Sequence, residues 1–175
     1  MEETTISLKK YILIYGIILG ILFVTYNVII YISNGTINRN WIHTVIDLSI
    51  RIGIIIFGIK AYKLANNGFL KLSEAIKIGL GIVLIAGIMA VIWNIILNII
   101  IEPDMISQKF NTQKQQIIDR NPGMSPEEVN QDMAVIKTYS SLPVMSIIVI
   151  IWNLFLGLII SIIGGAIIQK KKDVF

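Results

Sequence analysis

Four long apolar runs dominate this 175-residue chain and decide what it can fold into. They cover residues 11–32, 41–64, 74–101 and 143–168. A helix needs about 20 apolar residues to cross the hydrocarbon core of a bilayer, and each run is long enough. Hydrophobic residues make up 55% of the chain, which is more than a soluble domain carries. We therefore predict an all-α polytopic membrane protein, a single domain with four transmembrane helices in an antiparallel bundle.

The polar stretch of about residues 103–142 is predicted to form an extracytoplasmic helical hairpin between the third and fourth spanning helices. A turn is expected at residues 121–123, followed by Ser125 and Glu128 placed to form a capping box. Apolar side chains recur at helical spacing in both halves, at Ile106, Phe110, Ile117 and Ile118 and then at Val129, Met133 and Ile136. Two amphipathic helices lying over the bundle mouth or on the lipid surface would bury these stripes.

Local patterns predict the ends of the spanning helices. The second is expected to end at Asn66, Asn67 and Gly68, because glycine readily adopts the left-handed conformation that closes a helix. Ser73 is expected to be the N-cap of the third helix, and Pro143 is expected to begin the fourth, since a first turn needs no proline N–H.

Orientation follows from the distribution of lysine and arginine. The N-terminal segment, the second connection and the C-terminal tail carry nine basic residues: Lys9, Lys10, Lys60, Lys63, Lys71, Lys77, Lys170, Lys171 and Lys172. The opposite side carries Arg39, Lys109, Lys114, Arg120 and Lys137, together with six carboxylates in its long loop. The positive-inside rule then places both termini in the cytoplasm. We expect a multi-pass membrane protein.

Each spanning helix has one face of small and polar residues, the kind of face that packs against other helices in a bilayer. These faces contain Gly16, Gly20 and Asn27; Asp47, Arg51 and Gly58; Gly79, Ala86, Ala90 and Asn94; and Asn153, Gly157, Ser161 and Gly165. By depth, one polar layer in the outer half of the membrane is predicted from Asn27, Asp47, Arg51, Asn94 and Asn153.

Asp47 and Arg51 are the candidate site of this layer, because they stand one helical turn apart and can pair. The reading we favour is a structural pair that fixes helix register, with the asparagines forming hydrogen bonds between helices. The functional alternative is an anion, proton or lipid-headgroup site, in which Arg51 binds the ligand and Asp47 tunes it.

Composition excludes several chemistries. The chain contains no cysteine and one histidine, His43, which rules out thiol catalysis, disulfides and histidine-based metal clusters. The intramembrane residues offer no arranged nucleophile and base, so no catalytic residue, cofactor or metal is predicted and an enzyme is not expected. The basic residues cluster beside the apolar runs rather than in a groove, which points to lipid and not to nucleic acid.

Four features carry a resemblance to a known family. They are Leu72–Gly79 (LSEAIKIG), the Glu102 and Pro103 exit, Asn121–Glu128 (NPGMSPEE), and the small-residue fourth helix that ends in lysines. Together they resemble the bacterial four-helix membrane proteins of domain of unknown function 4199. The resemblance implies a small four-helix inner-membrane protein with no established activity and no catalytic residues to carry over.

Two functions therefore stay open. The first is a non-enzymatic accessory or assembly protein that packs in the lipid bilayer with itself or with a membrane-protein partner. The second is a transporter or binding module for a small molecule, ion or lipid, using the polar layer. A water-accessible cavity at Arg51 would favour the second function, and a dry, paired Arg51 would favour the first.

Overall fold

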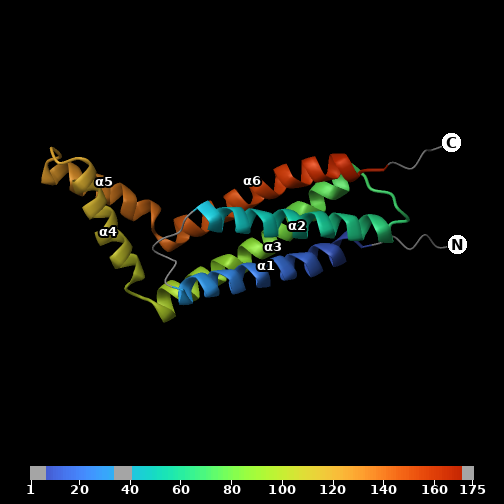
Figure 1. Cartoon of the computed structure of the whole chain (residues 1–175), viewed down its shortest axis with the longest axis horizontal. Helices are drawn as coiled ribbons and strands as arrows, with labels where there is room; N and C mark the ends of the chain where they lie inside the picture. The colour runs from blue at the N-terminus through green and yellow to red at the C-terminus, as the bar shows by residue number, and fades with distance from the viewer. Residues whose placement is uncertain (1–6, 34–40, 171–175) are drawn as a thin grey trace. The chain divides into compact units, whose positions relative to one another are not determined.

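The computed structural model describes residues 7–33 and 41–170, and this part of the chain is helical apart from its connections (Figure 1). Its elements are α1 (Leu8–Ile32), α2 (Trp41–Ala65), α3 (Leu72–Ile96), the π-helix η1 (Leu97–Ile101), α4 (Met105–Arg120), α5 (Pro126–Tyr139) and α6 (Leu142–Ile168). Among the described residues, α1, α2, α3 with η1, and α6 are long and apolar enough to cross a membrane. The all-α, four-span prediction is confirmed.

Some predictions fall outside the described residues. Arg39, Lys171 and Lys172 of the charge count do so, and the side chains of Ile106 and Lys109 are likewise not described. The described residues form two compact units. We call Met1–Ala90 with Ile150–Phe175 the membrane unit, and Val91–Val149 the hairpin unit.

The helices of the membrane unit approach each other closely at glycines, which have no side chain to keep the backbones apart. A Cβ at Gly58 of α2 would lie 2.7 Å from Ile82 Cδ1 of α3. On α1, a Cβ at Gly16 would lie 2.8 Å from Ile85 Cβ of α3. The predicted small-residue faces are thus the packed faces, as bilayer packing requires. Fully buried core side chains lie among them: Leu19, Ile55, Ile59, Ile78, Ile82 and Val83.

The connection between α2 and α3 shows one prediction confirmed and one wrong. Asn67 (φ 53°) and Gly68 (φ 80°) are left-handed, and the Gly68 N–H donates to Lys63 O at 2.9 Å, closing α2 as expected. Ser73 is not the N-cap, because α3 already begins at Leu72. Lys71 takes that position, and its N–H donates to Glu74 Oε2 at 2.8 Å.

A pair of backbone bonds joins this connection to the end of α6. Leu70 and Lys170 exchange N–H···O bonds of 2.9 and 3.0 Å as an isolated antiparallel bridge. Lys63 Nζ also donates to Ile168 O at 2.7 Å, which satisfies a carbonyl that the helix end leaves free. The last spanning helix is therefore fixed to the α2–α3 connection by main-chain bonds as well as by packing.

In the hairpin unit, α4 and α5 pack against each other. The Ser125 and Glu128 capping box is present as predicted: the Ser125 N–H donates to Glu128 Oε2 at 2.7 Å, and the Glu128 N–H donates to Ser125 Oγ at 3.3 Å. Val129 is buried, and Ile136 is half-buried, but Ile118 is 41% exposed and so lies off the packed face.

The end of the third spanning helix also differs from expectation. We expected one α-helix up to Ile101, whereas the last residues are π-helical, with the Glu102 N–H donating to Leu97 O at 2.8 Å. The fourth begins at Leu142, one residue before Pro143, which stays within the first turn.

Candidate functional site

Arg51 of α2 is the centre of a buried polar cluster in the membrane unit. Only 4% of the residue is exposed. Its Nη2 donates to Asp47 Oδ2 at 3.3 Å, and its Nη1 donates to Asn153 Oδ1 of α6. The guanidinium carbon lies 4.7 Å from the centre of the Phe23 ring of α1. We call Phe23, Asp47, Arg51 and Asn153 the Arg51 cluster, and it joins three helices.

Each member of the Arg51 cluster is placed by its position on a helix. Asp47 and Arg51 are four residues apart, which brings their side chains together on one face. Phe23 presents its ring to the cation, an attraction that strengthens when both groups are desolvated. On the remaining helix, Gly87 lies against Asn153: a Cβ at Gly87 would be 3.9 Å from Asn153 Cβ, so no side chain crowds the amide.

The electrostatics of the Arg51 cluster combine a buried cation with a partly exposed anion. Removing a lone guanidinium from water is costly, and a close carboxylate together with a neutral acceptor offsets part of that cost. The Asp47 side chain retains 25% exposure. Arg51 Nε is buried and has no hydrogen-bond partner among the described residues. Two of the three guanidinium nitrogens are thus hydrogen-bonded, and Nε is the nitrogen without a partner among the described residues.

The structure brings together three of the five residues predicted for the polar layer: Asp47, Arg51 and Asn153. Asn27 is half-buried, and its Nδ2 donates to Phe23 O at 2.8 Å, one turn back on its own helix. The expectation of a bond between helices is therefore wrong for Asn27, because the carbonyl of its own helix is closer. Asn94 belongs to the hairpin unit, where it lines a cavity.

Sequence reasoning missed two contacts near the polar layer. Phe23 was treated as an ordinary apolar residue, although it stands on the same α1 face as Gly16, Gly20 and Asn27 and could have been placed against Arg51. His43 was considered only as a metal ligand, but its Nδ1 lies 2.9 Å from Tyr26 Oη in a hydrogen bond that joins α1 and α2.

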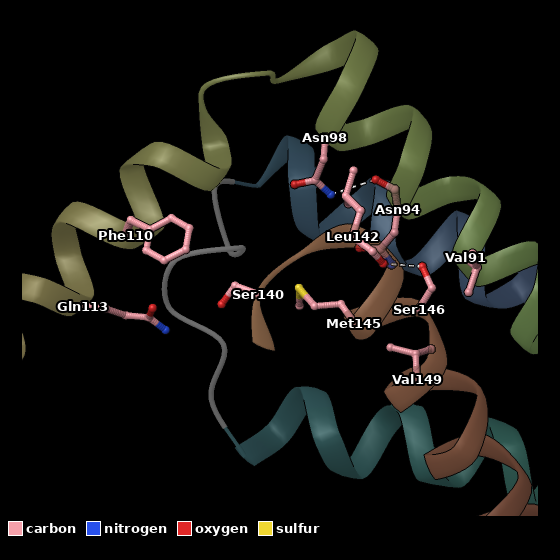
Figure 2. A pocket seen from close by; sticks show the side chains of 10 residues that line it. All are labelled: Val91, Asn94, Asn98, Phe110, Gln113, Ser140, Leu142, Met145, Ser146 and Val149. Carbon is pink, nitrogen blue, oxygen red and sulfur yellow. Dashed lines mark hydrogen bonds between the residues drawn. The ribbon is translucent and has the colours of Figure 1, made fainter. Parts of the chain in front are cut away.

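A second candidate site is a cavity of about 130 Å³ in the hairpin unit (Figure 2). Its polar lining residues are Asn94, Asn98, Gln113, Ser140 and Ser146. Its apolar lining residues are Val91, Phe110, Leu142, Met145 and Val149. All of them lie within Val91–Val149, so one compact unit forms the cavity. Arg51 is not part of its lining.

Within the described ranges, no group of three or more His, Asp or Glu side chains is arranged to hold a metal ion. The structure thus gives no reason to place a metal in either candidate site, and the absence of a metal or cofactor stays a prediction.

Comparison with protein families bears on the whole chain. Residues 14–170 match the model of the family described as protein of unknown function (DUF4199). The chain belongs to this family. The DUF4199 match includes residues of all four spanning helices and of both candidate sites. No curated protein and no solved structure matches the chain.

Proposed function

We propose that this DUF4199 protein is a non-enzymatic accessory or assembly protein of the inner membrane, with both termini in the cytoplasm. The observation that carries the proposal is the internal pairing of Arg51. The residue is 4% exposed, and its guanidinium bonds to Asp47 of the same helix and Asn153 of α6 and lies over the Phe23 ring of α1. A buried arginine that is paired within the protein holds helices in register, and its hydrogen-bonding groups are poorly accessible to a solute.

The described cavities support this choice. The cavity of about 130 Å³ and a second one beside Gln113, Ile117 and Ile136 both belong to the hairpin unit, and neither has Arg51 in its lining. Orientation is supported by Lys60, Lys63, Lys71 and Lys77, which gather around the α2–α3 connection and favour a cytoplasmic position for it.

The hairpin unit supports a role in contacting a partner. Its two helices present exposed side chains along most of their length, among them Val135 (55%) and Tyr139 (62%). Exposed aromatic and aliphatic residues on an otherwise polar helix pair are the kind of anchors that protein interfaces use. The partner is a second copy of this chain or another membrane protein.

A transporter or small-ligand binding module is the second candidate function, and one observation favours it. Arg51 Nε is a buried donor without a partner among the described residues, and Asp47 beside it is partly exposed. An anion or a lipid headgroup entering along Asp47 would satisfy that donor.

Cysteine accessibility separates the two functions, because the natural chain has no cysteine. Single cysteines replace Asp47, Arg51 and Asn153, with Ser125→Cys as an exposed control, and intact cells are treated with a membrane-impermeant thiol reagent. The accessory function predicts labelling of the Ser125→Cys protein alone. Labelling of the cysteines at 51 and 153 would reveal a water-filled path and would favour the transporter.

Partner contact is tested by photo-crosslinking in cells. A photoreactive phenylalanine analogue replaces Tyr139 or Val135, and the matched control replaces Ile21 of α1, which is 52% exposed on a spanning helix. We expect one protein adduct of constant mass at the hairpin positions and lipid adducts alone at position 21. Lipid adducts alone at all three positions would contradict the accessory role.

A further inference from the structure

The cavity of the hairpin unit combines hydrogen-bonding and apolar side chains in one partly open space (Figure 2). None of the lining residues that the structure describes carries a formal charge. An ionic group placed there would lose hydration without gaining a counter-charge from these residues. An uncharged ligand loses less hydration free energy, since the amides and hydroxyls of the cavity can replace its hydrogen bonds to water.

Some of the polar groups are already bonded, and this shows which ones a ligand can use. Asn98 Nδ2 donates to Asn94 O at 2.7 Å, and Ser146 Oγ donates to Leu142 O at 2.7 Å. The Asn98 side-chain oxygen, the Gln113 amide and the Ser140 hydroxyl make no other side-chain hydrogen bond within the described part of the chain. Asn98 provides an acceptor, while Gln113 and Ser140 can both donate and accept.

The backbone beside Asn98 also departs from regular helix. Asn98 lies in η1, the π-helical turn of Leu97–Ile101, where the helix takes an extra residue per turn. Such turns interrupt α-helices at an energetic cost and are found frequently at functional sites. Here the π-helical turn lies at the wall of the cavity and carries one of the three available polar groups.

The two ends of the cavity differ in chemistry. Val91 and Val149 lie together at one end, and Phe110 and Gln113 lie at the other (Figure 2). The two valines belong to α3 and α6, which are long and apolar enough to span a membrane. A ligand that matches both ends is amphipathic, with a hydroxylated head near Asn98, Gln113 and Ser140 and an apolar tail near the valines.

Volume limits the size of the head. A cavity of about 150 Å³ accommodates benzene, a molecule of roughly six non-hydrogen atoms. The cavity of about 130 Å³ therefore fits a glycerol-sized group, and a longer tail must leave it. We propose that the hairpin unit binds an uncharged lipid by its glycerol-sized hydroxylated head group. A monoacylglycerol is the simplest lipid of this class.

The test uses the full-length protein purified in detergent and 1-monooleoylglycerol as the probe. Native mass spectrometry counts the bound molecules during a titration. A diazirine-bearing analogue is then crosslinked, and the modified peptides are mapped. We expect one saturable site with crosslinks near Phe110 or Met145. Free glycerol, which lacks the tail, and oleoyl lysophosphatidate, which is anionic, are expected to bind at least tenfold more weakly.

Variants locate the head group. Gln113→Leu and Asn98→Leu each remove hydrogen-bonding groups and are expected to weaken binding about fivefold, the usual effect of losing one neutral hydrogen bond. Gln116→Leu, on the same helix but outside this lining, is the matched control and should leave binding unchanged. Val149→Phe fills the apolar end and should abolish binding. Gln113 is exposed, so its variant tests the site even if Val149→Phe does not fold.

Three results would overturn the proposal. One is the absence of saturable monooleoylglycerol binding to the natural protein. Another is binding of glycerol or lysophosphatidate as tight as that of monooleoylglycerol, which would show that the tail or the uncharged head does not contribute to binding. The third is an equal effect of Gln113→Leu and Gln116→Leu.

Discussion

Replacing Asn153 by leucine tests whether the Arg51 cluster holds the spanning helices together. The variant removes the acceptor of Arg51 Nη1 and leaves that nitrogen in a site where the residue is 4% exposed. Hydrogen bonds to charged groups contribute about 1.5–3 kcal/mol, and a buried donor left unsatisfied loses the full amount. We therefore expect Asn153→Leu to lower the free energy of unfolding by about 2–3 kcal/mol.

The matched control is Asn27→Leu. It removes a bond of 2.8 Å to Phe23 O within one helix, at a half-buried position. A neutral bond of this kind is worth about 0.5–1.5 kcal/mol, and leucine regains part of it by favouring helix and lipid. We expect Asn27→Leu to lower the free energy of unfolding by about 0.5 kcal/mol. The assay is unfolding by sodium dodecyl sulfate in mixed micelles, followed by the near-ultraviolet circular dichroism of the aromatic residues.

A triple variant separates geometry from charge. Asp47→Leu, Arg51→Met and Asn153→Leu together replace the buried polar groups by apolar ones of similar size, a change that is often neutral or stabilising. The triple variant should therefore be more stable than Asn153→Leu alone. Equal costs for Asn153→Leu and Asn27→Leu would refute the reasoning, because they would show that the bond to Arg51 contributes nothing beyond an ordinary amide contact.

Three further predictions follow from the packing and the caps. Gly79→Ala would place a Cβ against the Ser161 side chain and should lower the free energy of unfolding by about 1–3 kcal/mol in the same assay. Gly53→Ala is the control, because its Cβ meets open space; it should leave the free energy of unfolding unchanged or raise it by up to about 1 kcal/mol. Lys63→Met removes the donor to Ile168 O and should cost about 1 kcal/mol in that assay; no change would show that the backbone bridge alone fixes the end of α6. Hydrogen bonds from the Ser125 N–H, and to a smaller extent from its hydroxyl, lower the pKa of Glu128. The stabilisation of α5 by this cap is therefore complete above the ordinary glutamate pKa and is lost as pH falls through the lowered pKa. The protection factors of the amides at the start of α5, which compare their exchange with the intrinsic rate at each pH, should therefore fall in acid, and Glu128→Gln should remove this pH dependence.

The sequence was informative about the spans because their length and apolar content depend on the bilayer more than on tertiary contacts. The packed faces were predictable from small residues such as Gly16 and Gly58, because close approach of helices in a bilayer requires them. The capping box at Ser125 and the left-handed residue Gly68 are local motifs that need no knowledge of neighbouring helices. Boundaries differed by one to three residues, as at Leu72, where Lys71 rather than Ser73 stands at the N-cap and its N–H donates to the Glu74 side chain.

The candidate site was less predictable. Depth along the helix grouped Asn27 and Asn94 with Arg51, but depth says nothing about the direction in which a side chain points. Asn27 bonds within its own helix, and Asn94 lines a cavity in the other compact unit. The π-helical turn at Leu97–Ile101 is a change in hydrogen-bond register within an unbroken apolar run, and periodicity did not indicate it.

The residues of the Arg51 cluster are synthesised at different times. Arg51 belongs to the second spanning helix, while its partner Asn153 belongs to the last, and the whole hairpin unit is synthesised between them. At about 5–20 residues per second, roughly 5 to 20 s pass between the synthesis of Arg51 and that of Asn153. Throughout this interval the guanidinium has only Asp47 and Phe23 as partners. The nascent protein must therefore keep α2 near water, or beside the insertion machinery, until α6 arrives, and closure of the bundle is the final step of its biogenesis.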